Sequence, residues 1–488
     1  MKEQDVKVTV CSFLELFTKE AIFPIGIDTY QRPYVWGEDK VQELINDLTE
    51  YLKDPKGLCY YMGNVLLHQH NQKQKLFIID GQQRLTTLSI LYFVLNGKFT
   101  DGDKMTMEYH SPLSTLNIKK TQLLFDGIKE QWKDKADFLF SNINLTCITT
   151  LEEDMAFTFF DTQNNRGVKL NPTDLLKAYH LRSIGNAEYL DIQINCASRW
   201  EKIQSYNTLF GQKKDYTAEL FHQFLWRSRV WRGQRVIYRE NDNEVLNEFQ
   251  KNTLPNQSSV TIPLYPNANN TLGKKLTIKV NQGYTIQPAN IESSNNSAHL
   301  PFTLRQPISD GLGFFLFAEK YADLVRLLLV DKDLKDNEIK AFRVFYNQVW
   351  SNVSLYLKEL YVLSTVMYYD KFGSEKLLEY CLWLDHVLGA IRIEKQYIFK
   401  EAPLKFLKES DNNLLDVISQ AFRTEEVILF LKKINNTRAV YSNEKIKSGK
   451  GVQGWYKQNV LGYYDKSDFN QKHNWINENF INTKLNSK

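Results

Sequence analysis

The sequence has few of the features that mark secreted, zinc-binding or membrane proteins. Only five of its 488 residues are cysteine, and no two of them form a Cys-x-x-Cys pair. This argues against a zinc ribbon and against a disulfide scaffold. The first ten residues contain no signal-peptide core, and no uninterrupted apolar run reaches the ~18 residues of a membrane-spanning helix. We therefore expect a cytoplasmic protein with no membrane partner.

The chain also lacks a strong excess of charge of one sign. Its net charge of +4 is too small to imply nucleic-acid binding by itself, so the distribution of charge has to carry that argument. A content of 43% hydrophobic and 24% charged residues is ordinary for a globular protein. The length of 488 residues is enough for about two to four domains.

The most informative stretch is 76–88, Leu-Phe-Ile-Ile-Asp-Gly-Gln-Gln-Arg-Leu-Thr-Thr-Leu. It predicts a strand that ends at Asp80, a turn at Gly81 and a buried helix from Leu85 onward. Free N–H groups at a helix start favour an anion, Arg84 would add a bidentate fork for phosphate, and Asp80 could hold a divalent cation or orient a water. The alternative is a plain helix cap with Arg84 in solvent, although a cap needs neither the glutamines nor the arginine.

A second polar feature precedes this stretch. Residues 30–36 read Tyr-Gln-Arg-Pro-Tyr-Val-Trp, and Pro33 forces Arg32 into an extended conformation, which prevents a helix there. Three aromatic residues and an arginine on such a segment indicate a loop folded over another group. The alternative is an aromatic loop packed on its own core. Around both features the pattern predicts strands over 6–10, 21–27, 60–68 and 76–80 and helices over 12–19 and 38–53.

Three blocks of sequence resemble a known family, the GmrSD-type N-terminal domains. They are Gln-Arg-Pro-Tyr-Val-Trp at 31–36 with Tyr-Met-Gly-Asn-Val at 61–65, Ile-Asp-Gly-Gln-Gln-Arg-Leu-Thr-Thr-Leu at 79–88, and residues 159–170 followed by Asp-Leu-Leu-Lys at 174–177. The resemblance covers roughly residues 12–185 and extends to GmrSD and SspE, which act in modification-dependent restriction and phage defence. It implies a ParB/sulfiredoxin-like N-terminal domain. The pattern of the remaining sequence predicts a mainly α-helical C-terminal region with a small β insertion, so we expect an α+β fold.

The resemblance also implies NTP binding and hydrolysis that license DNA cleavage. Arg32 and Arg84 would take phosphates, and Asp80 would hold Mg²⁺ or position a water. Gln82 or Gln83 would orient the γ-phosphate or the attacking water. Further contacts to the nucleotide, ATP or GTP, are predicted for Gln31, Arg32, Tyr34, Trp36, Gly81, Thr86, Asn165 and Arg166, with Tyr34 or Trp36 stacking on the base.

Two further features of the sequence bear on the predicted nucleotide site. The sequence has no Gly-x-x-x-x-Gly-Lys-Ser/Thr loop, so any hydrolysis is not of the P-loop kind. Residues 155–183 predict a helix, a turn at 164–167 and a second helix that begins near Pro172. Asn165 and Arg166 then lie either at the phosphate site or in a purely structural turn.

The second half of the chain offers a basic stretch. Residues 226–239 hold five arginines and no acid before Glu240. Arginine interleaved with aromatic residues suits phosphate contact and base stacking, so nucleic-acid contacts are predicted for Arg227, Arg229, Arg232 and Arg235. The alternative is a solvated helix face.

The pattern divides the chain into five segments. These are a ParB-like nucleotide-binding domain (1–100), a helical extension that completes it (101–240), a polar β/loop insertion (241–305), a helical bundle (306–435) and a C-terminal cap or tail (436–488). Strand-like pieces are expected at 259–264 and 275–280, and long helices over 344–367 and 374–391.

A nuclease centre is hard to find. Many relatives carry a His-Asn-His-like nuclease with a His-x-x-Pro core, but none of the eight histidines here is followed by Pro three residues later. His386 and His473 fit a core or surface position better. Asp28, Glu38 and Lys40 form a carboxylate nuclease pattern only formally, because that spacing often arises by chance.

The sequence therefore predicts the NTP-binding and NTP-hydrolysing component of a bacterial anti-phage DNA restriction system. DNA cleavage would come from a partner nuclease chain or from an unrecognised site. The partners considered are DNA, that nuclease chain and further copies of this chain in a homo-oligomer. Two alternatives stay open: a non-catalytic nucleotide- or DNA-sensing regulator, and a self-contained metal-dependent DNA nuclease.

Overall fold

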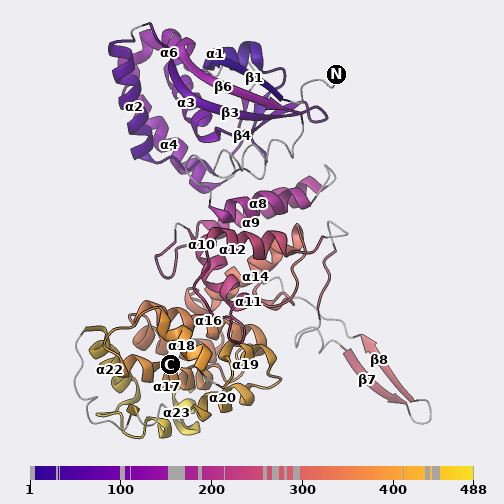
Figure 1. The fold of residues 1–488 in the computed structure, drawn as a ribbon, viewed down its shortest axis with the longest axis vertical. Coiled ribbons are helices and arrows are strands. Elements are labelled where there is room, and N and C mark those ends of the chain that lie inside the picture. Colours follow the sequence, from indigo (N-terminus) through magenta and orange to yellow (C-terminus); the bar gives the residue numbers. More distant parts are fainter. Residues whose placement is uncertain are drawn as a thin grey trace. The chain divides into compact units, whose positions relative to one another are not determined.

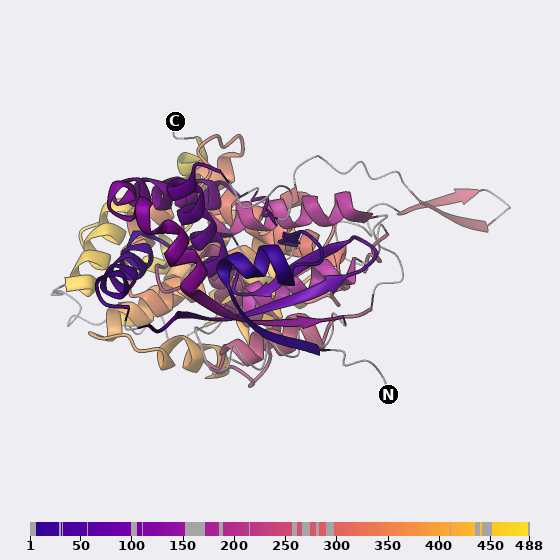
Figure 2. The same cartoon turned by 90° about the horizontal axis from the view of Figure 1, so that it is seen from above.

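The chain folds into two compact units, Met1–Ser205 and Tyr206–Lys488, which are drawn in Figure 1 and, from above, in Figure 2. The computed structural model describes residues 6–28, 31, 33–55, 57–98, 105–109, 111–151, 171–184, 189–213, 215–255, 261–265, 274–279, 283–288, 297–409, 411–434, 440–441 and 451–486. Arg32, Asn165 and Arg166 lie outside these residues. The predicted division into five segments is finer than the two units and stays a prediction.

The first unit is built on a six-stranded mixed sheet with the strand order β1-β6-β3-β4-β2-β5. Its strands are β1 (Val6–Ser12), β2 (Ile25–Gly26), β3 (Tyr60–His70), β4 (Lys75–Asp80), β5 (Met105–Thr106) and β6 (Ile143–Thr150). β3 forms the predicted antiparallel hairpin with β4 and pairs in parallel with β6. β2 is shorter than the strand predicted over 21–27, because Pro24 has no N–H to donate to a neighbouring strand.

The helices of the first unit include those predicted over 38–53 and from Leu85 onward. They are α1 (Phe13–Glu15), η1 (Leu16–Glu20), α2 (Glu38–Lys53), α3 (Gln82–Asn96), α4 (Pro112–Asp126), α5 (Lys129–Trp132), η2 (Lys133–Lys135), α6 (Ala136–Asn142), α8 (Pro172–Ser183) and α9 (Leu190–Gln204). α2 buries the predicted apolar face of Val41, Leu44, Ile45 and Leu48. α3 is buried on most sides, as its nearly continuous apolar sequence indicates.

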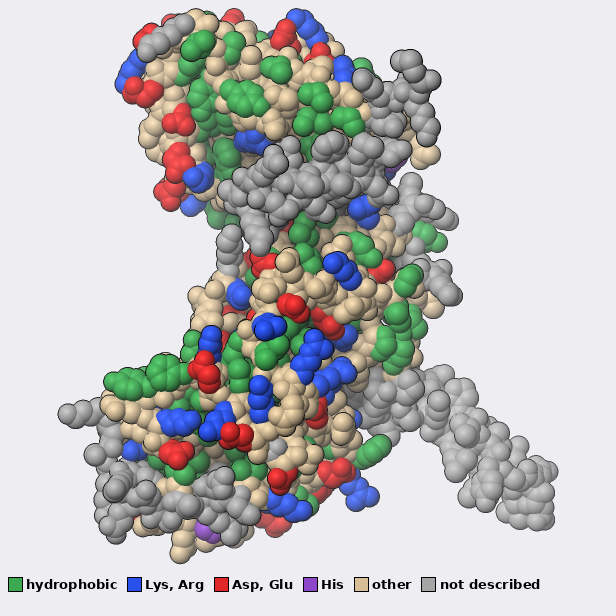
Figure 3. All heavy atoms as spheres, in the orientation of Figure 1, with side chains coloured by type: hydrophobic (Ala, Val, Ile, Leu, Met, Phe, Trp, Pro, Cys, Tyr) green, Lys and Arg blue, Asp and Glu red, His purple; other side chains and the backbone are tan. Residues whose placement is uncertain are grey.

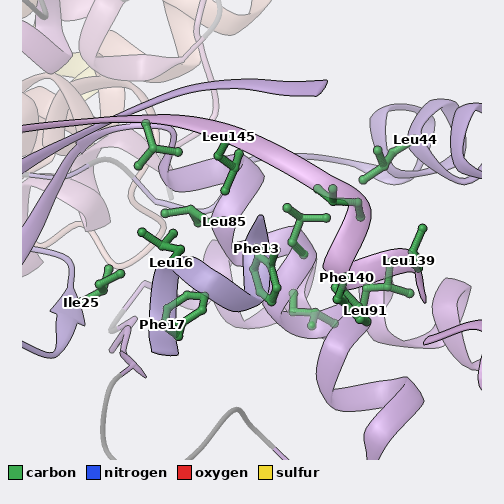
Figure 4. Close-up of a cluster of buried hydrophobic side chains, with 14 of the residues drawn as sticks. Phe13, Leu16, Phe17, Ile25, Leu44, Leu85, Leu91, Leu139, Phe140 and Leu145 are labelled. Atoms are coloured by element: carbon green, nitrogen blue, oxygen red, sulfur yellow. The ribbon is translucent and has the colours of Figure 1, made fainter. Parts of the chain in front are cut away.

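Aromatic and leucine side chains form the core of this unit (Figure 4). Phe13 lies at its centre, with ring centroids 5.1 Å from Phe17 and 5.3 Å from Phe140. Leu85 and Leu91 of α3 are fully buried in the same cluster. The core therefore fixes α3, the helix that begins directly after Asp80 and Gly81.

The second unit is mainly helical, which together with the first unit makes the chain an α+β protein. Its elements are α10 (Tyr216–Glu219), η4 (Leu220–Trp226), α11 (Arg227–Val230), α12 (Asp242–Leu246), η5 (Asn247–Lys251), β7 (Lys274–Lys279), β8 (Gly283–Pro288), η6 (Ser297–His299), α14 (Leu312–Leu329), α15 (Asn337–Phe345), η7 (Tyr346–Trp350), α16 (Leu355–Phe372), α17 (Leu377–Glu394), α18 (Glu401–Glu409), α19 (Leu414–Gln420), α20 (Thr424–Lys433), α22 (Gly451–Tyr464), η9 (Lys472–Asn474) and α23 (Glu478–Asn486). None of the helices that the structure describes is both long and apolar enough to cross a membrane.

Three elements of this unit differ from prediction. The helix predicted over 344–367 is interrupted after Trp350, and α16 begins at Leu355. Residues 261–264 of the strand predicted over 259–264 are not in a strand, and Pro263 could not complete a ladder there. Residues 242–251 are helical rather than part of a polar loop, because Asn241 caps α12 by accepting a hydrogen bond from the Glu244 N–H.

Candidate functional site

The predicted strand–turn–helix junction is present in the first unit. β4 ends at Asp80, and α3 begins at Gln82. Gly81 between them has φ 93°, in the left-handed region that favours glycine. A Cβ at this position would also lie 3.0 Å from Cγ2 of Val65, so the turn requires glycine. Gly81 gives the first turn of α3 no side-chain cap, and Gly81, Gln82 and Gln83 are themselves buried.

The two charged residues of the junction lie at its accessible edge. Nη2 of Arg84 is 3.4 Å from Oδ2 of Asp80, and the two side chains are 24% and 36% exposed. Arg84 also donates from Nη1 to the carbonyl of Met62, at 3.1 Å. The guanidinium is thus oriented by β3, while its long contact with Asp80 can be exchanged for a ligand at little energetic cost.

Gln83, in contrast, is buried and holds the aromatic loop. Its Oε1 accepts hydrogen bonds from the N–H groups of Val35 and Trp36, at 2.8 and 3.3 Å. Its Nε2 donates to the carbonyl of Pro33, at 3.0 Å. One amide side chain therefore satisfies three backbone groups of a segment that has no secondary structure of its own, which fixes the loop against the start of α3.

Gln82 and Thr86 face the same neighbour. Tyr109 places its hydroxyl 3.1 Å from Nε2 of Gln82 and 2.6 Å from Oγ1 of Thr86. Both Gln82 and Thr86 are buried, and burial raises the pKa of Tyr109 above its ordinary value. The sequence prediction did not include Tyr109, because no motif marks it.

Gln31 joins the aromatic loop to the strand that carries Asp80. Its Nε2 donates to the carbonyls of Ile78 and Ile79, at 2.7 and 3.1 Å. The carbonyl of Gln31 in turn accepts a hydrogen bond from Nζ of Lys177, at 3.1 Å. Gln31 therefore lies beside the junction, and its side-chain N–H groups are used by the protein itself. Its nucleotide contact stays a prediction.

Lys177 is a buried residue of the Asp-Leu-Leu-Lys block at 174–177. It lies on α8, is 1% exposed, and its Nζ is 3.0 Å from Oε1 of Glu201 on α9. The same ammonium bonds to the Gln31 carbonyl. The ion pair with Glu201 compensates the charge of the buried lysine, and the lysine ties α8 to the aromatic loop.

The two aromatic residues predicted to stack on a base lie in different environments. Tyr34 is fully buried, and its hydroxyl bonds to Thr87 and Thr121, at 2.8 and 3.1 Å. Burial raises the pKa of the Tyr34 phenol. Its ring therefore packs in the core rather than at a surface. Trp36 is only partly buried against that core, so of the two it has the more accessible ring.

A small cavity lies beside this network. It measures about 60 Å³ and is lined in part by Asp28, Gln31, Glu108, Tyr109 and Glu201. A water in the liquid takes up about 30 Å³, so the cavity is too small for a nucleotide. Its three carboxylates would also repel phosphate. A nucleotide would instead have to lie at the accessible edge formed by Asp80 and Arg84.

The formal carboxylate pattern of Asp28, Glu38 and Lys40 is not assembled into one site. Glu38 pairs with Lys120 at 3.0 Å, and Lys40 pairs with Glu43 at 2.5 Å on α2. Within the residues that the structure describes, no group of three or more His, Cys, Asp or Glu side chains could hold a metal ion. These contacts give no support to a self-contained metal-dependent nuclease.

The basic stretch of the second unit separates into buried and exposed arginines. Arg227 is buried, pairs with Glu240, and pairs with Glu359 at 2.7 Å. Arg229 lies 2.5 Å from Glu248 and donates to two backbone carbonyls. Their guanidinium groups are thus occupied inside the protein, against the prediction that they contact nucleic acid.

Arg232 and Arg235 are exposed. They flank a tight turn in which the Arg235 N–H donates to the Arg232 carbonyl at 2.8 Å. On the face drawn in Figure 3, acidic and basic side chains are mixed across the second unit. A DNA contact there therefore depends on particular residues, and the prediction remains with Arg232 and Arg235.

Comparison with known proteins divides the chain in nearly the same place as its structure does. Residues 13–181 match the family model described as the GmrSD restriction endonuclease, N-terminal domain. Residues 192–448, more than half of the chain, match a model described as a family of unknown function (DUF7834). A search of curated proteins found no match.

Proposed function

The chain belongs to the family of unknown function that its second unit matches and carries a GmrSD restriction endonuclease N-terminal domain, and from this we propose that it is the nucleotide-driven component of a DNA restriction system. In this proposal the first unit binds and hydrolyses ATP or GTP. Foreign DNA is the other ligand, and cleavage is supplied by a partner nuclease chain. A homo-oligomer is compatible with these roles.

The proposal rests on one observation: in the Asp80–Arg84 motif (residues 80–84) the glutamines are buried, whereas the charged residues are partly exposed. The two glutamines are buried, and Gln83 is committed to the aromatic loop. The two charged residues are partly exposed and make only a long contact with each other. A purely structural motif would have no need to keep an acid and an arginine accessible beside an uncapped helix start.

Each accessible group suits one part of a nucleotide. Arg84 can donate two parallel hydrogen bonds to a phosphate, and the N–H groups at the start of α3 favour the same negative charge. Asp80 can then turn from Arg84 to a metal ion or a water. Trp36 offers the partly exposed ring for the base. Predicted phosphate contacts by Arg32, Asn165 and Arg166 fall outside the described residues and belong to the proposal on the strength of the motif.

A magnesium ion fits the donor set in one particular way. Magnesium is commonly held by one or two carboxylates together with phosphate oxygens and waters. Asp80 is a single accessible carboxylate, so the ion would arrive with the nucleotide rather than reside in a protein cage. Bound there, it would supply neutralisation of the charge that develops on the phosphates.

The orienting role predicted for Gln82 or Gln83 remains a separate proposal. Gln83 could reach a γ-phosphate or a water only by releasing the backbone of residues 33–36. We assign Gln83 to positioning, which leaves Gln82 as the candidate for orientation. The burial of both Gln82 and Gln83 favours a second function, a regulator that binds nucleotide without turnover. In that case neither glutamine would orient an attacking water.

The test is release of phosphate from each NTP with Mg²⁺, with and without DNA, with the integrity of the DNA scored in the same reaction. Asp80→Asn and Arg84→Met should each lower turnover by roughly 10²-fold or more. Asp137→Asn and Lys133→Met change exposed charges on other elements of the first unit and should leave turnover unchanged. Nucleotide binding without turnover would favour the regulator, and cut DNA with intact NTP would overturn the proposal.

A further inference from the structure

The second unit contains a larger pocket, of about 480 Å³, that is separate from the Asp80–Arg84 motif. One wall is the turn at Gly233 and Gln234, and the opposite wall comes from residues between 411 and 426. This volume lies within the range of small-molecule pockets, about 300–1,000 Å³. We refer to it below as the Gly233 pocket.

The two walls are fixed to each other by hydrogen bonds. The Gly233 N–H donates to Oδ2 of Asp416 at 2.6 Å, and Nδ2 of Asn413 donates to the Gly233 carbonyl at 3.1 Å. Gln234 donates from Nε2 to the carbonyl of Lys408 at 2.9 Å. Arg305 holds Asp416 from the other side at 2.5 Å. The pocket is therefore preformed rather than a gap between loose loops.

The groups that remain available in the pocket are an aromatic ring, amides and carboxylates. Phe422, between α19 and α20, is 92% exposed, although a phenyl ring gains strongly from burial. Asp411, Asn412 and Gln420 are exposed lining residues. Among the hydrogen bonds that the structure describes, none uses their side chains. These groups can bind a ligand without first breaking a contact within the protein.

Charge is distributed in opposite senses inside and outside the pocket. Asp411 and Glu426 line it, so a phosphate inside would be repelled. Arg232 and Arg235 are exposed and stand immediately before Gly233 and immediately after Gln234 in the chain. A ligand with a neutral, hydrogen-bonding ring and an anionic backbone satisfies both regions at once.

We propose that the Gly233 pocket binds the base of an unpaired nucleotide in DNA. Phe422 stacks on the base, which is the sequence-tolerant part of such recognition. Asn412 and Gln420 bond to the base edge, and Asp411 accepts from an exocyclic amino group. Arg232 and Arg235 contact the flanking phosphates. The proposal adds a base-binding site to the proposed function and rests on it for DNA as the ligand.

The carboxylates make the proposal specific. An acid in the pocket accepts hydrogen bonds from the amino groups of cytosine and adenine, whereas thymine has no exocyclic amino group to donate. Single-stranded DNA should therefore bind with cytosine or adenine preferred over thymine. A protein that only tracked the backbone would show no such preference.

The experiment is fluorescence anisotropy with the full chain and labelled single-stranded oligonucleotides of dC, dA or dT. No ATP or GTP is added. The wild-type protein should bind dC and dA more tightly than dT. Phe422→Ala should weaken dC binding by about tenfold, and because Phe422 is exposed its loss should leave the melting temperature unchanged. Phe399→Ala, which removes another exposed phenyl ring of the same unit, should bind as the wild type does.

Substitution of an arginine beside the pocket should change DNA affinity in a different way from substitution of Phe422. Arg235→Ala should weaken binding to all three oligonucleotides by the same factor and reduce the dependence of affinity on salt. Lys340→Ala removes an exposed cation outside the pocket and should change neither. Equal binding by Phe422→Ala and wild type, tightest binding to dT, or no binding at all would each overturn the base site. Phosphate release is measured separately, so loss of one activity does not decide the other.

Discussion

A Cβ atom on Gly63 would lie 2.3 Å from Nη1 of Arg84. Gly63 is on β3, has φ +99°, and lies at the irregularity in the β3–β6 pairing between Tyr61 and Asn64. The guanidinium of Arg84 thus occupies space that only a glycine leaves open. The family resemblance quoted this glycine within 61–65 without giving it a role.

Gly63→Ala should displace the guanidinium of Arg84 from its present position. Because the clashing atom is the end of a flexible side chain, the guanidinium rather than the strand should shift. Alanine at this positive φ should cost about 1–2 kcal/mol of the free energy of unfolding. Nucleotide affinity should fall by about tenfold, as expected for a lost hydrogen bond to a charged group. Isothermal titration with a non-hydrolysable NTP tests this, and unchanged affinity in a folded variant would contradict it.

Gln83→Met tests the positioning role of the buried amide. The variant keeps the volume of the side chain but removes three hydrogen bonds to Pro33, Val35 and Trp36. The loss should be about 2–4 kcal/mol in the free energy of unfolding. Hydrogen exchange at residues 35–36 should accelerate more than exchange in α2. Gln42→Met alters an exposed glutamine of α2 and should change neither quantity.

Tyr34 and Trp36 can be distinguished by paired substitutions. Tyr34→Phe removes the hydroxyl that bonds to Thr87 and Thr121, so it should cost about 1–2 kcal/mol of stability and leave nucleotide affinity unchanged. Trp36→Ala should weaken nucleotide binding by about tenfold if its ring stacks on the base. A large loss of affinity in Tyr34→Phe would instead show that the Tyr34 hydroxyl contributes to nucleotide binding.

The strand–turn–helix junction could be predicted from sequence because its signals are local. Four apolar residues, Asp80 and Gly81, and then an apolar run specify strand, turn and buried helix within one short stretch. The role of Gln83 could not be predicted in the same way. Its partners are backbone groups of residues 33–36, nearly fifty positions earlier in the chain, and no side-chain pattern marks a backbone acceptor.

The burial of Arg227 and Arg229 could not be predicted from the basic stretch for a related reason. Arg227 and Arg229 have no acid nearby in the sequence before Glu240. Their partners, Glu240, Glu359 and Glu248, come from other elements that fold around them. Local charge counts detect an excess of cations but not the distant acids that neutralise them. The pocket at Gly233 is likewise formed by segments far apart in the chain.

Lys177 offers a test of how α8 supports the aromatic loop. Lys177→Met leaves Glu201 without its partner, so it should cost about 3 kcal/mol of stability and also weaken nucleotide binding through Gln31. Lys177→Arg should restore part of the stability. Adding Glu201→Gln to Lys177→Met should recover part of the loss, because the uncompensated charge is gone. Additive losses in the double variant would contradict a direct pair.

His222 predicts a dependence of stability on pH in the second unit. It lies in η4, its Nδ1 is 2.8 Å from the Ala218 carbonyl, and burial lowers its pKa below the ordinary value of 6.5. The unfolded chain therefore takes up a proton near pH 6.5 that the folded protein takes up only at lower pH. The stability present above pH 6.5 is lost as the pH falls below it, by at most about 1.4 kcal/mol per pH unit.

Urea unfolding measured between about pH 5.5 and 7.5 should show this loss in the wild type and a smaller one in His222→Gln. All other titrating groups are shared by the two proteins, so the difference between their slopes isolates His222. Asp242 lies 3.6 Å from Nε2 and opposes the effect of burial. Asp242→Asn should therefore steepen the loss at low pH. Parallel slopes in wild type and His222→Gln would show that the pKa of His222 is the same in the folded and the unfolded protein.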